Sequence, residues 1–241
     1  MKAMILAAGI GLRLKPLTDK TPKALIKIGE KTMLELVLAR LVRAGVSSVV
    51  INLFHLADQV QEFLNKKAPF PVPITISKER ELLDTGGGLK KAAPFFDDGQ
   101  PFFVHNVDVL SDIDLDAMYR HHLAHPALAT LAVQKRPSSR ALLFDSQGRL
   151  CGRQGKSAPE WAGRPKAGAK PLAFSGIHVV SPELFPKMTE SGIFPIMEAY
   201  LRLAGEGETI RAFNAGGAAW NDIGTPARLE EARRTYLRTE Q

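Results

Sequence analysis

Cysteine and long apolar runs are scarce in this sequence of 241 residues, and each scarcity excludes a class of protein. The single cysteine, Cys151, rules out an internal disulfide framework and is typical of a reducing compartment. No apolar run approaches the roughly 18 residues of a membrane helix, so we expect no membrane partner. The opening MKAMILAAGIGL has the apolar run of a signal peptide but no small-residue cleavage site, and Arg13 follows at once. We therefore predict a cytoplasmic protein whose first apolar run is a buried strand.

Acidic residues are fewer than basic ones, 25 against 32, which gives a net charge of +7. A positive balance attracts anions, from nucleic acids to small phosphorylated molecules. The basic residues are scattered and mixed with acids, as in ARLEEARRTYLRTEQ at the C-terminus, which is typical of a solvated helix face. No helix-turn-helix or RNA-recognition signature is present. We therefore expect no nucleic-acid partner and favour small phosphorylated ligands.

Apolar runs of the β type alternate with helical patterns in the first half of the chain. In the stretch 32–45, Thr32 and Glu35 form a capping box and Gly45 stands where a C-terminal cap belongs, so this stretch is predicted to be a helix. Strands are expected at 3–7, 48–52, 73–77 and 101–106, and further helices around 55–66 and after 86–88. This alternation predicts an α/β fold with a doubly wound sheet of parallel strands and right-handed crossovers.

The pattern changes after about residue 110. Strands without intervening helices are expected at 127–134, 141–150 and 172–181, so the sheet should be mostly parallel but mixed. Residues 152–171 are rich in Gly, Pro and Lys and indicate a long loop. The histidines of HHLAH, at 121–125, are typical of a solvated helix face rather than a metal site, and His105 is typical of a core histidine.

The stretch LAAGIGLRLKPLTDKTPKAL, residues 6–25, turns glycine-rich and cationic directly after the first expected strand. Glycines allow a close backbone approach to an anion, but Leu14 stands at the third position of a G-x-G-x-x-G fingerprint and no P-loop triplet follows. The pattern places Arg13 on a glycine-based loop and Lys23 on a proline-flanked element. Arg can clamp a phosphate bidentately and Lys can follow a reacting phosphoryl group. The alternative is a plain strand-to-helix connection with surface basic side chains.

Two aspartates follow apolar runs. Asp108 ends FFVHNVDV and Asp222 lies in AAWNDIGTP. Ligands of open α/β sheets bind at the carboxyl ends of strands, and Mg²⁺ binds one or two carboxylates plus substrate oxygens. The alternative is that each aspartate caps a helix or turn.

Three glycines follow Thr85 in ELLDTGGGLKKA. Residues 86–88 would permit the backbone to approach a flat group such as a nucleobase. The alternative is that they simply open a helix.

Taken together, LAAGIGLRLKPLTDKTPKAL, LDTGGGLKKA, NVDV, FSGIHVV and WNDIGTP resemble the motifs of the sugar-1-phosphate nucleotidyltransferases, or nucleoside-diphosphate-sugar pyrophosphorylases, over essentially the whole chain. Within this family the chain is most similar to the short bacterial N-acetylmuramate-1-phosphate uridylyltransferases of peptidoglycan recycling. The resemblance implies a Rossmann-like nucleotidyltransferase fold with a small accessory sugar-binding region. It implies one domain over 1–241, with a nucleotide-binding half at 1–110 and a sugar-binding half with a C-terminal helix at 111–241.

The resemblance also implies a role for each motif residue. Arg13 would bind the departing pyrophosphate and Lys23 would contact phosphate at the reacting centre. Asp108 and Asp222 would ligate Mg²⁺. The residues implied in nucleotide binding are Ala7, Ala8, Gly9, Gly11, Thr85, Gly86 and Gly87, and those implied in sugar binding are Asn106 and Gly176.

The implied reaction transfers a nucleotidyl group from an NTP, here UTP, to a sugar-1-phosphate, here N-acetylmuramate-1-phosphate. The sugar phosphate attacks the α-phosphorus in line and pyrophosphate leaves, so no general base is required because the nucleophile is already ionised. Two alternatives stay open: a mannose- or heptose-1-phosphate guanylyltransferase, and a non-catalytic nucleotide-sugar sensor or regulatory subunit. The resemblance leaves a monomer and a small homo-oligomer equally open.

The sequence departs from the family pattern in two places. Val107 stands where relatives usually have glycine beside the metal aspartate, which could narrow the space next to the ion. The accessory region lacks the Glu-Lys pair that holds the sugar and its phosphate in relatives acting on glucose or deoxythymidine nucleotides. Lys156, Lys166 and Lys170 could attract the lactyl carboxylate of a muramate sugar, or simply belong to a solvated loop.

Overall fold

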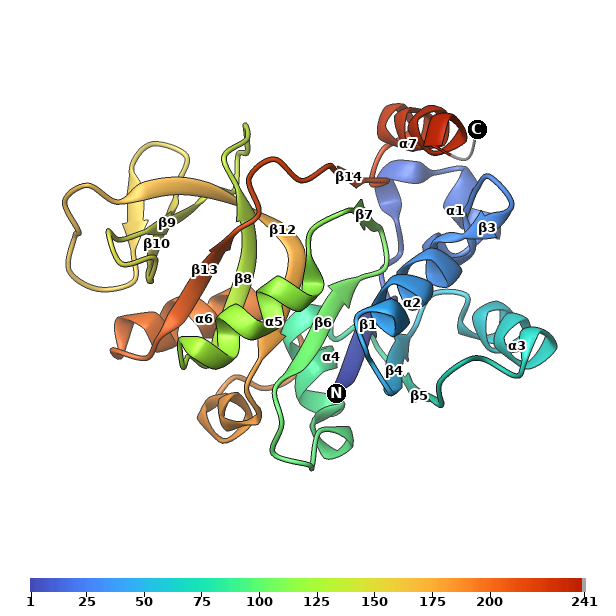
Figure 1. Cartoon of the computed structure of the whole chain (residues 1–241), viewed down its shortest axis with the longest axis horizontal. Helices are drawn as coiled ribbons and strands as arrows, with labels where there is room; N and C mark the ends of the chain where they lie inside the picture. The colour runs from blue at the N-terminus through green and yellow to red at the C-terminus, as the bar shows by residue number, and fades with distance from the viewer. Residues whose placement is uncertain (240–241) are drawn as a thin grey trace.

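Parallel strands build the first half of the main sheet in this computed structural model, which describes the backbone of residues 1–239 and side chains to residue 235 (Figure 1). β1 pairs in parallel with β4 on one side and β6 on the other, and β5 extends the sheet beyond β4. These strands are β1 (Lys2–Leu6), β4 (Ser48–Leu53), β5 (Ile74–Lys78) and β6 (Phe102–Asn106). The four strands expected in the first half are therefore confirmed, as is the parallel arrangement.

The second half makes the sheet mixed, as predicted. β12 pairs antiparallel with both β6 and β8, and β13 runs parallel to β8. These strands are β8 (Ala129–Gln134), β12 (Lys170–Val180) and β13 (Ile210–Asn214). The N-terminal part of β12 leaves the main sheet and pairs with β9 of a small antiparallel layer, at the far left of Figure 1. That layer consists of β9 (Leu142–Phe144), β10 (Leu150–Gln154) and β11 (Pro159–Trp161).

Helices cover both faces of the main sheet. One face packs against α2, α3 and α5 through a core that includes Ile5, Ile51 and Phe103. The other packs against α4 and α6 through Met4 and Phe102, since successive strand residues point to opposite faces. The helices are α2 (Met33–Arg43), α3 (Ala57–Lys67), α4 (Asp84–Lys91), α5 (Leu115–Ala124), α6 (Ile196–Gly205) and α7 (Pro226–Thr239). This two-sided covering confirms the doubly wound architecture.

The N-terminus of α2 follows the predicted capping box. The Thr32 hydroxyl accepts a hydrogen bond from the Glu35 amide at 3.3 Å, and the Glu35 carboxylate accepts one from the Thr32 amide at 2.8 Å. Gly45, with φ of +80°, follows the helix in the left-handed conformation. Local sequence chemistry is therefore sufficient to place both ends of this helix.

The three glycines of ELLDTGGGLKKA lie inside α4, whereas the sequence analysis expected a helix to begin after them. A Cβ on Gly86 would lie 2.3 Å from the Phe194 ring, and a Cβ on Gly87 would lie 2.4 Å from the Gly192 carbonyl oxygen. The Gly86 and Gly87 amides also donate hydrogen bonds to the Phe194 carbonyl, at 2.9 and 3.2 Å. The glycines therefore let the segment before α6 pack directly on the α4 backbone.

We expect Gly86→Ala to lower the free energy of unfolding by about 2–3 kcal/mol, because the new methyl group overlaps a packed ring and a backbone carbonyl. Thermal or denaturant unfolding measures this, with a fall in Tm of roughly 5–10 °C expected for a domain of this size. Gly163→Ala is the matched control, since a Cβ there meets nothing closer than 3.8 Å. Equal stability of the two variants would contradict this account of the helix packing.

The C-terminal helix packs beside the opening loop. α7 lies next to the segment that holds α1 (Leu17–Lys20), at the upper right of Figure 1. A separate apolar cluster joins them through Leu14, Ile28 and Met33 on one side and Leu229 on the other. A short ladder of β7 (Val109–Ser111) and β14 (Trp220–Asp222) leads into α7. Residues 223–232 are thereby anchored against residues 14–33.

Three expectations need correction. The stretch 152–171 is not wholly a loop, because its first residues belong to β10, residues 159–161 form β11 and its last residues begin β12. His122, expected on a solvated helix face, is 2 % exposed and its ring nitrogens contact the Thr130 and Ser181 hydroxyls at 2.8 and 2.9 Å. The sequence analysis also missed α6, although its apolar positions Ile196, Ala199, Tyr200 and Leu203 repeat with helical spacing.

Among the residues that the structure describes, no helix combines the length and the apolar character needed to cross a membrane.

Candidate active site

Two connected cavities open at the carboxyl ends of β1, β4 and β6. The smaller has a volume of about 250 Å³ and the larger about 950 Å³, and both are lined by Leu6, Thr85, Asn106 and Asp108. The rest of the small cavity wall consists of Ala7, Ala8, Gly9, Lys23, Asn52, Leu82, Asp84 and Val107. The large cavity extends over β12 and the β8–β9 loop. The strand ends thus place a small and a large compartment side by side, as ligand sites in open α/β sheets require.

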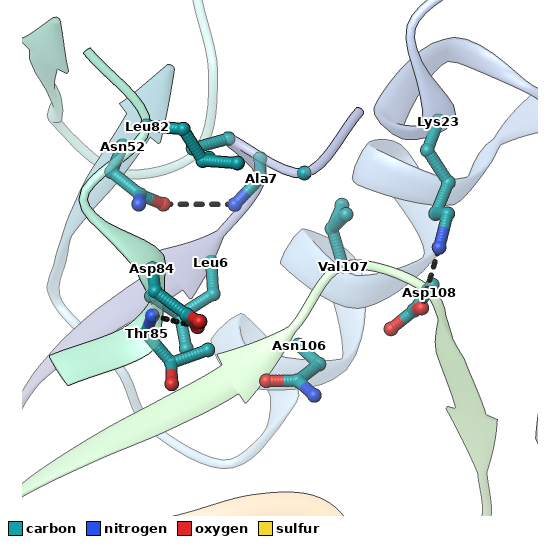
Figure 2. A pocket seen from close by; sticks show the side chains of 12 residues that line it. Leu6, Ala7, Lys23, Asn52, Leu82, Asp84, Thr85, Asn106, Val107 and Asp108 are labelled. Carbon is teal, nitrogen blue, oxygen red and sulfur yellow. Dashed lines mark hydrogen bonds and ion pairs between the residues drawn. The ribbon is translucent and has the colours of Figure 1, made fainter. Parts of the chain in front are cut away.

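A buried hydrogen-bond chain shapes the loop that lines the small cavity. The Ala7 amide donates to Asn52 Oδ1 at 2.8 Å, as Figure 2 shows, and Asn52 Nδ2 donates to Glu79 Oε1 at 2.7 Å. Glu79 Oε2 in turn accepts from the Leu83 amide at 3.0 Å. These hydrogen bonds tie the end of β1 to the segment before α4, so the two walls of the small cavity are held at a fixed separation. Ala8 and Gly9 continue this wall, and a Cβ on Gly9 would meet nothing within 4 Å.

Lys23 and Asp108 meet where the two cavities join. Their Nζ and Oδ2 atoms are 2.8 Å apart, with side-chain exposures of 14 % and 22 % (Figure 2). Lys23 comes from a single 3-10 turn, Lys23–Leu25, that follows Pro22, and Asp108 from the turn after β6. The pair therefore joins two segments that are distant in sequence at the boundary of both compartments.

Asp222 reaches the same place through the β7–β14 ladder. It pairs with Val109, and the Ile223 amide donates to the Asp108 carbonyl at 3.0 Å. Its Oδ1 accepts from the Gly224 amide at 2.9 Å and its Oδ2 from Arg228. Asp108 and Asp222 thus line one cavity from adjacent backbone positions, as the sequence analysis expected.

The two carboxylates fit Mg²⁺ by their chemistry. They supply hard, anionic oxygen donors in one cavity, and Mg²⁺ commonly takes one or two protein carboxylates together with substrate phosphates and water. Lys23 and Arg228 neutralise them in this structure, so the carboxylates are already held in place before any ion binds.

Arg13 lies in the wall of the large cavity next to Asp222. A Cβ on Gly224 would lie 2.7 Å from both Arg13 Nη2 and Asp222 Oδ1, so this glycine is required where the two side chains approach. Gly11 does not line either cavity. Its φ of +73° and the 2.9 Å hydrogen bond from the Thr18 hydroxyl to its carbonyl form the turn that presents Arg13.

Of the expected nucleotide-binding residues in LDTGGGLKKA, only Thr85 lines a cavity. Thr85 lines both cavities, and its hydroxyl accepts a hydrogen bond from the Ile196 amide at 3.0 Å. Gly86 and Gly87 are buried behind it against Phe194 and lie in neither wall. Their expected contact with a nucleoside stays a prediction, and what the structure shows for them is helix packing. Leu82 and Asp84, which the sequence analysis missed, line the small cavity instead.

Asn106 and Gly176 lie together in the large cavity. A Cβ on Gly176 would be 3.0 Å from Asn106 Nδ2 and 2.9 Å from Val109 Cγ2, and its φ is +74°. The glycine is therefore required both by the local bend of β12, between Phe174 and His178, and by its neighbours. Val107 is only 4 % exposed and packs against the core, and it also lines the small cavity next to Asp108.

The sequence analysis did not single out Arg136 or His178, which lie in the far wall of the large cavity. Arg136 stacks on Trp220 with its guanidinium carbon 3.6 Å from the ring centroid, and the indole donates to the Ser175 carbonyl at 2.8 Å. His178 also lines this wall, where burial lowers its pKa to about 3 and keeps the ring neutral at physiological pH. Lys156, Lys166 and Lys170, by contrast, are exposed and lie outside both cavity walls.

The fold and this site together define an α/β protein with cations and two aspartates at the carboxyl edge of its sheet. The chain belongs to the nucleotidyl transferase family, whose model matches residues 2–239.

Individual relatives agree with this membership. The chain is 34 % identical to the N-acetylmuramate alpha-1-phosphate uridylyltransferase of Neisseria meningitidis, over 97 % of each chain. It is 32 % identical to the enzyme of that name from Caulobacter vibrioides, over 95 % of this chain and 97 % of the other. Among solved structures, a UDP-glucose pyrophosphorylase from Acinetobacter baumanii superposes with a TM-score of 0.81 at 18 % identity, covering 98 % of this chain and 92 % of that one. The fold is therefore the Rossmann-like fold of nucleotidyltransferases.

Proposed function

We propose that this nucleotidyltransferase transfers a uridylyl group from UTP to N-acetylmuramate-1-phosphate and releases pyrophosphate. The observation that carries the proposal is the meeting of two compartments at Lys23 and Asp108. A nucleotide in the small cavity and a sugar phosphate in the large one would bring their phosphates together at this pair. The product would be a nucleotide sugar, which agrees with a role in peptidoglycan recycling.

The chain's own residues would position and neutralise the reacting groups. An anionic oxygen of the sugar phosphate attacks the α-phosphorus, the new P–O bond forms, and the bond to the β-phosphate oxygen breaks as pyrophosphate leaves. Lys23 would stabilise charge on the α-phosphoryl oxygens, and Arg13 would bind the leaving pyrophosphate. Because the nucleophile is ionised at neutral pH, the reaction needs orientation and charge neutralisation but no general base.

Asp108 and Asp222 would hold Mg²⁺, which when bound would neutralise further charge on the phosphoryl oxygens. The pairing of each carboxylate with a cation supports this role, because both carboxylates are oriented without the ion. The presence of Lys23 and both aspartates at one edge argues against a non-catalytic sensor, since such a protein does not need the catalytic set.

The choice of UTP and of a muramate sugar is supported by the names of the two bacterial relatives, each matched over nearly its whole length. The experiment is pyrophosphate release with Mg²⁺ and each of ATP, CTP, GTP, UTP and dTTP, crossed with a panel of sugar-1-phosphates that includes N-acetylmuramate-1-phosphate. We expect turnover with UTP and the muramate sugar. Turnover only with GTP and mannose- or heptose-1-phosphate would replace this proposal by a guanylyltransferase, and nucleotide binding without turnover would favour the sensor.

A further inference from the structure

Arg136 is fixed in the wall of the large cavity without a carboxylate partner. Its guanidinium stacks on Trp220, and its Nη2 donates to the Phe174 carbonyl at 2.7 Å. Within the described side chains it forms no ion pair, and its Nε is buried without a hydrogen-bond partner. Desolvation lowers the pKa of Arg136 and Arg228 adds to this effect, while Asp222 opposes it. A cation held this way has lost hydration that an anionic ligand could replace.

Two other arginines of the large cavity, Arg13 and Arg228, already lie against Asp222. Arg228 pairs with Asp222, and Arg13 lies against Gly224 beside the same carboxylate. Arg136 instead contacts Phe174 of β12, which pairs with Val133 of β8 where the register of β12 shifts. Arg140, on the same β8–β9 loop, adds a second positive charge to this wall. The cavity therefore carries cations in excess of those that reacting phosphates and the metal carboxylates need.

We propose that Arg136 recognises a carboxylate on the sugar substrate, so that the enzyme prefers acidic sugars over the corresponding neutral ones. This inference rests on the proposed function, because it assigns the lactyl carboxylate of the muramate sugar to a named side chain. The lactyl group is an ether-linked carboxylic acid that is ionised at neutral pH. A planar guanidinium matches a carboxylate bidentately, and the stack on Trp220 orients it before binding, so little side-chain entropy is lost.

The position of Arg136 favours a carboxylate over the reacting phosphate. Lys23 and Asp108 mark the reacting centre at the boundary with the small cavity, and Arg136 lines only the large one. Lys156, Lys166 and Lys170, the cations that the sequence alone offered for this carboxylate, lie outside both walls. Arg136 is thus a specificity-determining residue, and the loop lysines are solvated.

Binding of the two nucleotide-sugar products separates carboxylate recognition from phosphate recognition. UDP-N-acetylmuramate and UDP-N-acetylglucosamine differ only in the lactyl group, and UDP alone reports the nucleotide site. Isothermal titration of the full chain gives Kd for each without requiring turnover. We expect the wild type to bind the muramate product about 10–100-fold more tightly than the glucosamine product, the scale of one bidentate charged contact.

Arg136→Gln should reduce that ratio to about one to three while changing the Kd of UDP-N-acetylglucosamine little, and Arg136→Lys should restore part of it. Lys166→Gln removes the same charge outside the cavity and should leave the ratio unchanged. A wild-type ratio near one, or equal weakening of both products in Arg136→Gln, overturns the inference whether or not the variant is stable. Failure of the wild type to bind UDP at all would instead overturn the proposed function, and this inference with it.

Discussion

Lys23→Ala is expected to lower kcat by about 10²–10³-fold, the usual effect of removing one preorganised charge from a transition state. Lys23 is only 14 % exposed and contacts Asp108 at 2.8 Å, so its ammonium group is desolvated and held at the junction of the two cavities. Charge that develops on the phosphoryl oxygens would meet this group without rearrangement. The KM for the nucleotide should change much less than kcat, because the contact strengthens as the reaction proceeds.

Steady-state pyrophosphate release at saturating substrates measures this effect. Lys15→Ala is a matched control from the same segment: it removes one lysine charge that is half exposed, pairs with Asp19 at 3.0 Å and lies outside both cavity walls. The control should keep kcat within about twofold, as expected for an exposed ion pair. A loss of tenfold or less in Lys23→Ala would remove Lys23 from the catalytic machinery.

The sequence was sufficient for the features that rest on local chemistry and on strand order. Apolar runs that alternate with helical patterns predicted β1, β4, β5 and β6, and the capping box predicted the start of α2. The expectation that Asp108 and Asp222 would meet followed from the rule that carboxyl ends of strands share one edge. The structure brings them together in another way, because Asp222 lies on β14, which pairs antiparallel with β7 in a separate two-stranded sheet.

Other features depend on packing between distant segments, which a single sequence does not encode in a readable pattern. The burial of Gly86 depends on Phe194, more than 100 residues away, so the glycines looked equally suited to a nucleobase and to a helix start. The stack of Arg136 on Trp220 likewise joins two residues that are far apart in the sequence. Neither arginine nor tryptophan carries a local signal of such a partner.

The position of Lys156, Lys166 and Lys170 also depends on the tertiary structure and not on local sequence. A Gly-, Pro- and Lys-rich stretch is correctly expected on the surface, but its composition does not say which cavity it faces. Lys156, Lys166 and Lys170 are exposed and line neither cavity, so the positive charge of this stretch lies outside the walls. The charge that lines the large cavity comes instead from the short β8–β9 loop with Arg136 and Arg140.

Asp222→Asn is expected to lower the rate by about 10³-fold and to raise the Mg²⁺ concentration needed for half-maximal activity. The substitution keeps the size of the side chain and an oxygen for the Gly224 amide, which now donates to Oδ1 at 2.9 Å, so the local turn should persist. It removes one negative charge from the pair of carboxylates. Metal polarisation of phosphoryl oxygens contributes several kcal/mol, and about 4 kcal/mol corresponds to a factor of about 10³. Activity measured over a Mg²⁺ titration gives both quantities.

Arg228→Gln distinguishes the proposed contact of Asp222 with Mg²⁺ from its ion pair with Arg228. Arg228 pairs with the Oδ2 of Asp222, so loss of the aspartate also releases this arginine. If Asp222 acts through the metal, Arg228→Gln will not raise the Mg²⁺ requirement, because a competing cation has been removed from the carboxylate. If Asp222 serves only to orient Arg228, the two variants will show the same rate and the same Mg²⁺ dependence, and the assignment of Asp222 as a metal ligand will be wrong. Asp222→Asn with an unchanged Mg²⁺ requirement would lead to the same conclusion, since a carboxylate that binds the ion cannot lose its charge without weakening it.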